Sequence, residues 1–454
     1  MNYEDFIRQK AQFKGGDGIA VDELPGFLFD FQDYLVRYAL SRGRSAIFAD
    51  CGMGKTAMEL AWGDAIVKAT NRPVLLATPI AVGAQMVAEA EKFGIQAKRS
   101  RDGKIDDTAC IWITNYEQLH KFDPSMFVGF IGDESSCIKD AKSERKHTVV
   151  EFVRRMQYRL LCTATAAPND FFELGTSSEA LGYLGFRDMI TTFFKQETSK
   201  DHKGWGRTKY RFRGHAQEPF WAWVCSWARS LRKPSDLGFD DSRFVLPSLN
   251  EIEHVVETAK LRPGMLFAMA GRDLQEERAE RRNSIEERCE LAAKIAHDCD
   301  GPTVLWCELN PEGEMLSRLI SDSKEVKGSM PDELKEEYLT AFSTGQIKRL
   351  IIKPKIGAWG LNWQHCSNVV SFPSHSYEQY YQAVRRCWRF GQTKPVTVSL
   401  IVGEGESGIL KNIRRKADQT DHMFKSIVAH MKDAMHLVSS DFFPEKEIVP
   451  TWLS

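Results

Sequence analysis

Residues 45–56 read SAIFADCGMGKT, and the interpretation of the whole chain begins from this stretch. An apolar, strand-like run leads into a glycine-rich loop, and a helix-forming run follows the loop. Gly52 and Gly54 permit backbone dihedral angles that turn successive N–H groups toward one anion. Lys55 supplies a positive charge for phosphate groups, and the hydroxyl of Thr56 is placed to ligate Mg²⁺. The stretch therefore predicts a nucleotide phosphate site; the alternative is a glycine-rich turn with an incidental lysine.

Residues 130–136 read FIGDESS and place two carboxylates at the end of another apolar run. At the carboxyl edge of a sheet, Asp133 and Glu134 would face the phosphate loop. Asp133 is predicted to hold Mg²⁺, mostly through water, and Glu134 to polarise the water that attacks a γ-phosphate. Without the loop upstream, an acidic pair after a strand is usually only the solvated start of a turn.

Short apolar runs alternate with polar loops and helical stretches over much of the chain. This alternation predicts β-α-β crossovers and mostly parallel sheets that are covered on both faces. The first set of strand candidates is Ser45–Ala49, Val74–Ala77, Cys110–Ile113, Met126–Ile131 and Tyr158–Cys162. The second set is Val304–Cys307, Leu350–Ile352, Asn368–Phe372 and Val396–Ile401. A helix from about Ser407 to Met435 is expected to close the chain.

The expected fold class is therefore α/β, with two parallel-sheet lobes over residues 1–180 and 296–454. Residues 181–295 lose the alternation and are expected to form a helical, aromatic-rich insertion or brace between the lobes. Within this insertion, residues 203–213 read KGWGRTKYRFR and alternate cations with aromatic side chains. They either grip phosphates and stack on bases, or form an amphipathic strand with a solvated basic face. The cluster of Trp221, Trp223 and Trp227 is better explained by packing in the core or between the lobes.

Composition places the chain among ordinary globular proteins, with 43% hydrophobic and 27% charged residues. A length of 454 residues exceeds what one hydrophobic core usually supports. The formal net charge of −1 gives no global basic footprint, which argues against a passive DNA-coating protein.

Cysteine usage and hydropathy set the expected compartment. The ten cysteines are scattered singly with no Cys-x-x-Cys pair, so neither a zinc ribbon nor a disulfide framework is expected. No apolar run reaches the ~20 residues of a membrane span, and the N-terminal MNYEDFIRQK is charged. We expect a cytoplasmic protein with no membrane partner.

The acidic pair and the loop together resemble superfamily 2 helicases. DESS resembles their DEAD/DEAH box, and the loop has their form A-x-x-G-x-G-K-T, which accounts for Ala49 where other phosphate loops have glycine. Phe29-Asp30-Phe31-Gln32 resembles their adenine-reading glutamine motif, which implies that Gln32 binds the nucleotide. Residues 162–169, CTATAAPN, resemble motif III in its Swi/Snf version, with Ala164 in place of glycine and Ala166 in place of proline.

Two stretches of the second lobe carry the same resemblance. GAWGLNW, residues 357–363, is similar to motif V, and QAVRRCWRFGQ, residues 382–392, is similar to motif VI. Arg385 stands where motif VI usually has an acid. The nucleotide-site residues implied by these motifs are Gly360 and Gln382.

Motif VI also implies two catalytic arginines, Arg386 and Arg389. Arginines from a second lobe stabilise the charge that develops on a transferred phosphoryl group. On a helix, a spacing of three puts both side chains on one face. The alternative is a solvated or phosphate-gripping basic helix face.

Family analogy also assigns the residues that contact nucleic acid. Ala77-Thr78-Pro79 looks like motif Ia, and ITNYE, residues 113–117, looks like motif Ib. Short polar side chains in motifs Ia, Ib, III and V suit phosphate oxygens and carry no base information. The implied contacts are Thr78, Thr114, Asn115, Thr165 and Asn362. Thr163 and Thr165 are also expected to transmit lobe movement rather than to perform chemistry.

The resemblance covers roughly residues 24–180 and 296–435, and is nearest to the compact Swi/Snf-like motors of phage and prophage genomes, for which the compartment would be the host cytoplasm. It implies two RecA-like lobes, ATP and Mg²⁺ as ligands, and a DNA-dependent ATPase that moves along duplex or forked DNA and remodels or branch-migrates it. The alternatives are a strand-separating DNA or RNA helicase and an ATP-switched nucleic-acid-binding scaffold. A metabolic P-loop kinase fits the second lobe poorly.

Overall fold

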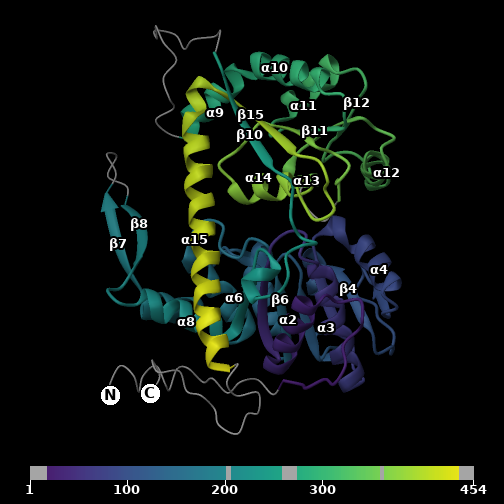
Figure 1. The fold of residues 1–454 in the computed structure, drawn as a ribbon, viewed down its shortest axis with the longest axis vertical. Coiled ribbons are helices and arrows are strands. Elements are labelled where there is room, and N and C mark those ends of the chain that lie inside the picture. The colour runs from purple at the N-terminus through teal and green to yellow at the C-terminus, as the bar shows by residue number, and fades with distance from the viewer. Residues whose placement is uncertain (1–17, 201–205, 258–273, 358–361, 439–454) are drawn as a thin grey trace. The chain divides into compact units, whose positions relative to one another are not determined.

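The computed structural model describes residues 18–200, 206–257, 274–357 and 362–438 (Figure 1). The chain divides into two compact units. Lobe 1 comprises the described residues up to 241 together with 419–438, and lobe 2 comprises those from 242 to 418. None of the helices in these ranges combines the length and apolar character needed to span a bilayer.

Lobe 1 is built on a seven-stranded sheet in which every pair of neighbouring strands is parallel. In spatial order the strands are β3 (Ala97–Arg99), β4 (Ile111–Asn115), β2 (Val74–Thr78), β5 (Gly129–Gly132), β6 (Tyr158–Cys162), β1 (Arg44–Ala49) and β9 (Ala228–Leu231). The helices between them include α2 (Asp30–Arg42), α3 (Lys55–Thr70), α4 (Gly83–Lys92), α5 (Glu144–Val153) and α6 (Leu174–Leu181). Strands β2, β4, β5 and β6 are buried along their whole length, as expected of parallel strands with both faces covered.

Lobe 2 is built on a six-stranded sheet, also parallel throughout. In spatial order its strands are β10 (Leu249–Val256), β15 (Val396–Gly403), β14 (Asn368–Ser371), β11 (Thr303–Trp306), β13 (Arg349–Ile352) and β12 (Ser323–Val326). Alternate residues of one strand enter two different cores: Val304 and Trp306 belong to one apolar cluster, and Leu305 to the other. This alternation follows from the two-residue period of a strand, so both faces of the sheet are buried. The remaining helices include α10 (Ile285–Asp298), α11 (Asn310–Leu319), α12 (Asp332–Ser343), α13 (Pro354–Gly357) and α14 (Tyr377–Val384).

All nine predicted strands are present, and the α/β fold with two parallel-sheet lobes is confirmed. The stretch 181–295 differs from the expected helical insertion, because it is shared between the lobes and contains strands. It gives α7 (Phe186–Phe193), the hairpin β7 (Phe194–Lys200) and β8 (Gly206–Phe212), α8 (Gln217–Trp227) and edge strand β9 to lobe 1. It gives edge strand β10 and helix α9 (Leu274–Asn283) to lobe 2.

The three tryptophans of α8 are packed inside lobe 1. Trp221, Trp223 and Trp227 are almost fully buried, and the rings of Trp223 and Trp227 lie 5.5 Å apart at 66°. An edge-on arrangement of this kind is favoured by the ring quadrupoles. Core packing, as predicted, is their role.

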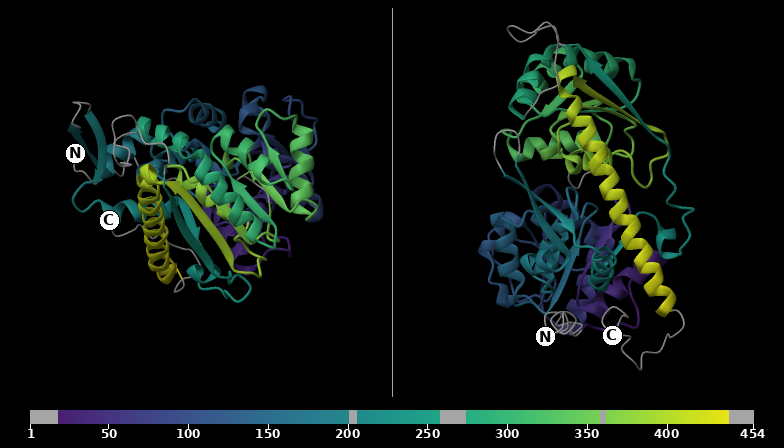
Figure 2. Two further views of the ribbon diagram at one scale, coloured as in Figure 1. Left: turned by 90° about the horizontal axis from the view of Figure 1, so that it is seen from above. Right: turned by 90° about the vertical axis from the view of Figure 1, so that its left-hand side faces the viewer.

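Helix α15 (Ser407–Val438) is unbroken from lobe 2 into lobe 1, as Figure 2 shows from two directions. In lobe 1, the Arg232 guanidinium pairs with Asp421 of α15 and lies 4.6 Å from the ring centroid of Phe424. Arg232 therefore anchors the middle of this helix in lobe 1.

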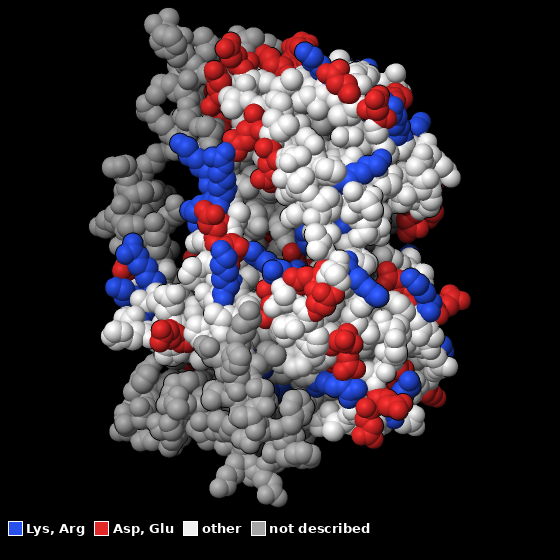
Figure 3. All heavy atoms as spheres, viewed as in Figure 1, with Lys and Arg blue, Asp and Glu red and all other residues white. Residues whose placement is uncertain are grey.

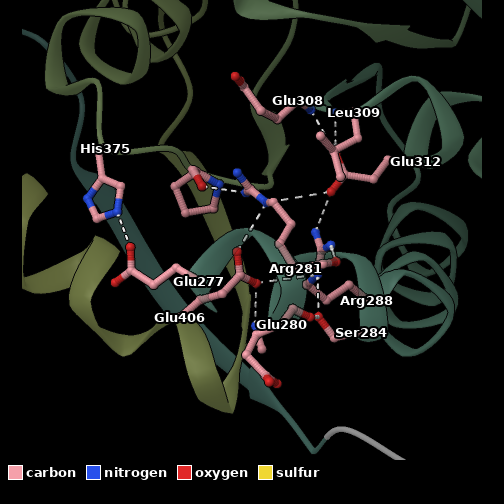
Figure 4. A network of polar contacts seen from close by, with 12 residues as sticks. Glu277, Glu280, Arg281, Ser284, Arg288, Glu308, Leu309, Glu312, His375 and Glu406 are labelled. Carbon is pink, nitrogen blue, oxygen red and sulfur yellow. Dashed lines mark hydrogen bonds and ion pairs between the residues drawn. The ribbon is translucent and has the colours of Figure 1, made fainter. Parts of the chain in front are cut away.

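A buried polar network supports the middle of lobe 2 (Figure 4). Arg288 of α10 donates to Glu312 of α11 over 2.7 Å, and Arg281 of α9 pairs with Glu406 over 3.1 Å. Arg281 also donates to the carbonyl of Pro373, in the loop that leads from β14 into α14. The network thus joins three helices to the segment that precedes motif VI.

Candidate functional site

The phosphate loop lies between β1 and α3, at the carboxyl edge of the lobe 1 sheet. Gly52 has φ 89° and Gly54 has φ 76°, both in the left-handed region that favours glycine. Gly54 is the N-cap of α3 and makes no side-chain cap, and the first turn of the helix carries no acidic residue. The N–H groups of Lys55 and Thr56 in that first turn are thus left for an anion, as a phosphate site requires.

Gln32, from α2, is bound to this loop. Its Nε2 donates to the carbonyl of Met53 over 3.0 Å, and its Oε1 accepts from the backbone N–H of Phe29. A Cβ on Gly54 would lie 2.2 Å from the same Nε2, so a larger residue would displace the Gln32 amide and would also be strained at φ 76°. The residue predicted to read the nucleotide therefore also fixes the shape of the loop.

Lys55 is half-buried and lies among acidic groups, and its Nζ donates to the carbonyl of Ala49 over 3.1 Å. Burial by itself lowers the pKa of Lys55, but the nearby charges of Glu134, Cys51, Asp133 and Asp50 outweigh this effect and raise it above its ordinary value. The ammonium group therefore stays charged, which is the state that binds a phosphate.

Asp133 follows β5 and is held from three directions. Its Oδ2 accepts a hydrogen bond of 2.7 Å from the Thr78 hydroxyl, its N–H donates to Ala77, and its carbonyl accepts from the Tyr116 hydroxyl. Burial, and next the charge of Glu134, raise the pKa of the Asp133 carboxyl to about 6, while the Thr78 hydroxyl and Lys55 act in the opposite direction. The carboxylate is thereby fixed in place with one oxygen left over for a further ligand.

Glu134 adopts a left-handed backbone conformation, with φ 48° and ψ 51°, and is one of two described non-glycine residues with positive φ. Its Oε2 accepts from the hydroxyl of Thr163, 3.2 Å away, and the same hydroxyl accepts from the N–H of Thr165. Strained backbone of this kind recurs at functional sites. A direct hydrogen-bonded link thus joins the acidic pair to motif III.

The residues fit a Mg²⁺-bound nucleotide. The glycine cradle, the uncapped start of α3 and the charged Lys55 provide for phosphates, and Thr56 and Asp133 provide oxygen ligands for the metal. Among the described residues, no three His, Cys, Asp or Glu side chains gather as a metal cage. Thr56 and Asp133 would suit Mg²⁺, which is commonly bound by one or two protein oxygens together with substrate phosphates and waters.

The motif VI arginines of lobe 2 are not on a helix, which corrects the predicted geometry. Helix α14 ends at Val384, and turns follow it through residues 385–391. Arg386 is buried and donates through Nε to the carbonyl of Gln382 and through Nη2 to its Oε1. Arg389 is only partly buried. The two side chains are therefore held differently within the lobe.

Arg385 occupies the place of the expected acid and has a different role. It is buried, and its guanidinium lies 4.8 Å from the ring centroid of Trp388 and 5.7 Å from that of Tyr381. Cation–π contacts of this kind suit arginine. The turn is closed instead by Gln392, whose Nε2 donates to the carbonyls of Cys366 and Cys387.

Of the predicted nucleic-acid contacts, only Asn362 is exposed in the structure. Thr78 is fully buried and bonded to Asp133, and Thr165 is fully buried beside Thr163. Thr114 and Asn115 are buried at the carboxyl end of β4. Gly360 lies outside the described residues. The assignment of Thr78 and Thr165 to the nucleic-acid surface is therefore not supported, because both side chains belong to the interior around the acidic pair.

Glu59 is a residue of this site that the sequence analysis missed. It lies one turn after Lys55 on α3, is fully buried, and neither carboxyl oxygen is paired with a described nitrogen or oxygen. Burial, followed by the charge of Asp133, raises the pKa of Glu59 well above its ordinary value, which Lys55 only partly offsets. Its spacing from Lys55 was the available signal, but a Glu on an expected helix is usually solvated.

Comparison with known proteins agrees with this fold. Residues 300–391 match the helicase conserved C-terminal domain. The structure of S. cerevisiae Dbp5 bound to RNA and ADP BeF3 shares 13% identity, covering 90% of this chain and 93% of that chain, with a TM-score of 0.52. The Sulfolobus solfataricus SWI2/SNF2 ATPase core in complex with dsDNA shares 15% identity, covering 94% and 98%, with a TM-score of 0.41. No curated protein matches the sequence.

The fold and the site define a P-loop ATPase with two RecA-like lobes. Residues 300–391 carry a helicase conserved C-terminal domain, and the chain as a whole shares the fold of Dbp5.

Proposed function

We propose that the protein couples ATP hydrolysis to movement along DNA, and that it remodels or branch-migrates duplex or forked DNA. The observation that carries the proposal is the linked set Lys55, Asp133, Glu134 and Thr163. It combines the groups that hydrolyse a phosphoanhydride with a hydrogen bond that leads out of the ATP site into motif III. A change at the γ-phosphate is thereby transmitted to the segment after β6.

Each residue has a defined chemical task in this proposal. Lys55 and the N–H groups at the start of α3 bind the β- and γ-phosphates. Glu134 accepts a proton from the attacking water as the oxygen bonds to the γ-phosphorus and the bond to ADP breaks. Thr56 and Asp133 would hold Mg²⁺, which would supply positive charge to neutralise the phosphates.

We assign to Arg386 and Arg389 the stabilisation of the charge that develops on the transferred phosphoryl group. Gln382 orients Arg386 through a hydrogen bond. Gln32 recognises the nucleotide base and holds the loop through Met53. Asn362 contacts the phosphate backbone of the nucleic acid, for which its exposure suits it.

DNA is preferred over RNA because the motif V and motif VI sequences resemble those of Swi/Snf-type motors, which act on duplex DNA. The RNA-bound state of Dbp5, whose fold this chain shares, favours a strand-separating RNA helicase as the second candidate. The two candidates differ in the polymer that stimulates ATP turnover.

The test is steady-state ATP hydrolysis by the purified protein at one fixed salt concentration, because the affinity for nucleic acid depends on salt. The reactions contain no nucleic acid, single-stranded DNA, duplex DNA, forked DNA or RNA. Strong stimulation by duplex or forked DNA supports the proposal, and displacement of a third strand from a triplex then reports movement. Stimulation by RNA alone overturns it in favour of the second candidate.

Two variants serve as controls. Lys55→Ala is expected to weaken nucleotide binding, and Glu134→Gln is expected to bind ATP but not to turn it over. ATP hydrolysis that persists in Glu134→Gln comes from a contaminant or from another base. ATP binding and steady closure on DNA without displacement of the third strand would indicate a switched scaffold rather than a motor.

A further inference from the structure

The hairpin of β7 and β8 in lobe 1 is a two-stranded antiparallel sheet that pairs with no other described strand. Its register places Phe194 opposite Phe212, Lys195 opposite Arg211 and Glu197 opposite Lys209. Because alternate residues of a strand occupy opposite faces, this register divides the hairpin into two faces of different composition.

The positions of the first face hold aromatic and uncharged polar residues, a glycine and one lysine, and those of the second face hold most of the charge. The positions on the first face are Phe194, Gln196, Thr198, Lys200, Gly206, Thr208, Tyr210 and Phe212. Those on the second face, which we call the basic face, are Lys195, Glu197, Ser199, Arg207, Lys209 and Arg211. By sequence, the positions of the basic face hold four cations and one carboxylate, of which the structure describes the side chains of Lys195, Glu197 and Arg211.

The aromatic side chains of the first face are used for anchoring. Phe194 and Phe212 stack with their ring centroids 4.6 Å apart, and both contact Phe220 of α8 edge-on, at 5.4 and 5.2 Å. Tyr210 contacts Phe172 edge-on at 5.1 Å. These rings attach the base of the hairpin to lobe 1 and are already committed to packing, so they are not free to stack on nucleic-acid bases.

The described cations of the basic face remain in solvent. The side chains of Lys195 and Arg211 are 56% and 65% exposed, and each pairs with Glu197, over 3.2 and 3.0 Å. Exposed ion pairs of this kind are worth little and exchange readily with other anions. In Figure 3, a small group of Lys and Arg side chains with one acidic patch beside it lies at the described part of the hairpin.

We propose that the basic face of the β7–β8 hairpin binds the phosphate backbone of the nucleic acid and does not read its bases. That the ligand is a nucleic acid rests on the proposed function. It is favoured by the excess of positive charge on one face of an anchored hairpin, in a chain whose net charge is −1. Backbone contacts of this kind hold a moving protein on its track without selecting a sequence.

The test replaces the two described cations together, in Lys195→Gln/Arg211→Gln. The matched control is Lys68→Gln/Lys104→Gln, which removes the same charge from two side chains of lobe 1 that are 73% and 89% exposed and also paired with carboxylates. Affinity for a fluorescein-labelled duplex is measured at several salt concentrations, and for duplexes of different sequence. ATP turnover without nucleic acid is measured in parallel.

The hairpin variant is expected to bind the duplex on the order of 10-fold more weakly, equally for all sequences. The slope of log K against log salt should fall by about 2, because each phosphate contact contributes about one unit. Turnover without nucleic acid and turnover at saturating duplex should be unchanged. The control variant and the charge-conserving Lys195→Arg/Arg211→Lys should both retain the wild-type slope.

Wild-type affinity and slope in the hairpin variant would overturn the assignment of the hairpin while leaving the proposed function intact. A wild-type protein that binds no nucleic acid would overturn both. Loss of affinity restricted to some duplex sequences would show that the hairpin reads bases, contrary to the proposal.

Discussion

The hydroxyl of Thr78 donates a 2.7 Å hydrogen bond to Oδ2 of Asp133, and both side chains are buried at the carboxyl edge of the lobe 1 sheet. Thr78 ends β2 and Asp133 follows β5, and β2 and β5 are neighbouring parallel strands. Their adjacency makes a motif Ia residue part of the ATP site. The bond turns one carboxylate oxygen toward Thr78 and stabilises the ionised form of Asp133.

Thr78→Val is therefore expected to weaken binding of Mg²⁺·ATP by about 10- to 100-fold, since a hydrogen bond to a charged group contributes roughly 1.5–3 kcal/mol. Thr78→Ser keeps the hydroxyl and should bind nearly as the wild type. Binding is measured with a fluorescent ATP analogue in the presence of Mg²⁺. Duplex affinity without nucleotide should be unchanged; a selective loss of that affinity would instead support the family's assignment of Thr78 to the DNA backbone.

The pKa of Asp133 predicts how Mg²⁺·ATP binding depends on pH. Burial and Glu134 raise this pKa to about 6, and only the ionised carboxylate ligates a metal. Affinity should be full above about pH 6 and fall toward tenfold per pH unit below it. In Thr78→Val the lowering effect of the hydroxyl is lost, so the fall should begin at higher pH. Equal affinity at pH 5 and pH 7 would contradict the role of Asp133 as a metal ligand.

Glu59 gives a prediction about stability rather than activity. Its pKa in the folded protein is raised by burial, so the folded state keeps a proton that the unfolded chain releases near pH 4.5. The folded state binds more protons in this window, and the free energy of unfolding therefore falls as pH rises, by up to about 1.4 kcal/mol per unit until the folded pKa is reached. Glu59→Gln should remove this fall and be more stable than the wild type at neutral pH. Urea unfolding at several pH values measures it, and parallel curves for both proteins would refute it.

The sequence predicted the sheet interiors well, because strands that are buried on both faces are continuous apolar runs. In the two parallel sheets it missed the four edge strands, β3, β9, β10 and β12. Strand β10 shows why: all eight of its positions are partly or fully exposed, and Asn and Glu residues are interspersed with apolar ones over part of its length. Such a segment joins a sheet through backbone pairing with β15, which composition does not reveal.

The phosphate loop and the acidic pair were predictable because each motif is local. Contacts between residues that are far apart in the sequence were not predictable. Glu59 is buried by its neighbours in the fold, and the turn after Val384 is set by the contacts of Gln392 and Arg385 rather than by helix propensity. The burial of Thr78 likewise follows from the position of β2 inside the sheet.

The buried network of lobe 2 predicts a large loss of stability in Arg288→Ala. The guanidinium is fully buried and bonded to Glu312, and its Nη2 donates to the carbonyl of Arg281 over 2.6 Å. Removing it leaves carboxylates buried without their partner, which typically costs 3–5 kcal/mol. Chemical denaturation measures the loss. Arg318→Ala, at an exposed position of α11, should change stability by less than about 0.5 kcal/mol.

Alanine substitutions at Arg386 and Arg389 should give different phenotypes, although the resemblance to motif VI implies the same catalytic role for both. Arg386 is buried and bonded twice to Gln382, so Arg386→Ala is expected to disturb the turn itself and to lower both the thermal stability and the turnover. Arg389 is partly exposed, so Arg389→Ala should keep the fold, the affinity for ATP and the affinity for duplex.

The expected defect of Arg389→Ala is in the chemical step alone, a loss on the order of 10³-fold in single-turnover hydrolysis with ATP bound. Arg389→Lys keeps the charge but not the forked donor geometry, and should recover only part of the rate. The melting temperatures of both alanine variants provide the control. A lowered melting temperature indicates that the turn no longer folds correctly, whereas an unchanged one indicates that only the positive charge has been lost. If Arg389→Ala hydrolysed ATP at the wild-type single-turnover rate, Arg389 would have no part in the chemical step. Arg386 would then be the cation that acts on the phosphoryl group.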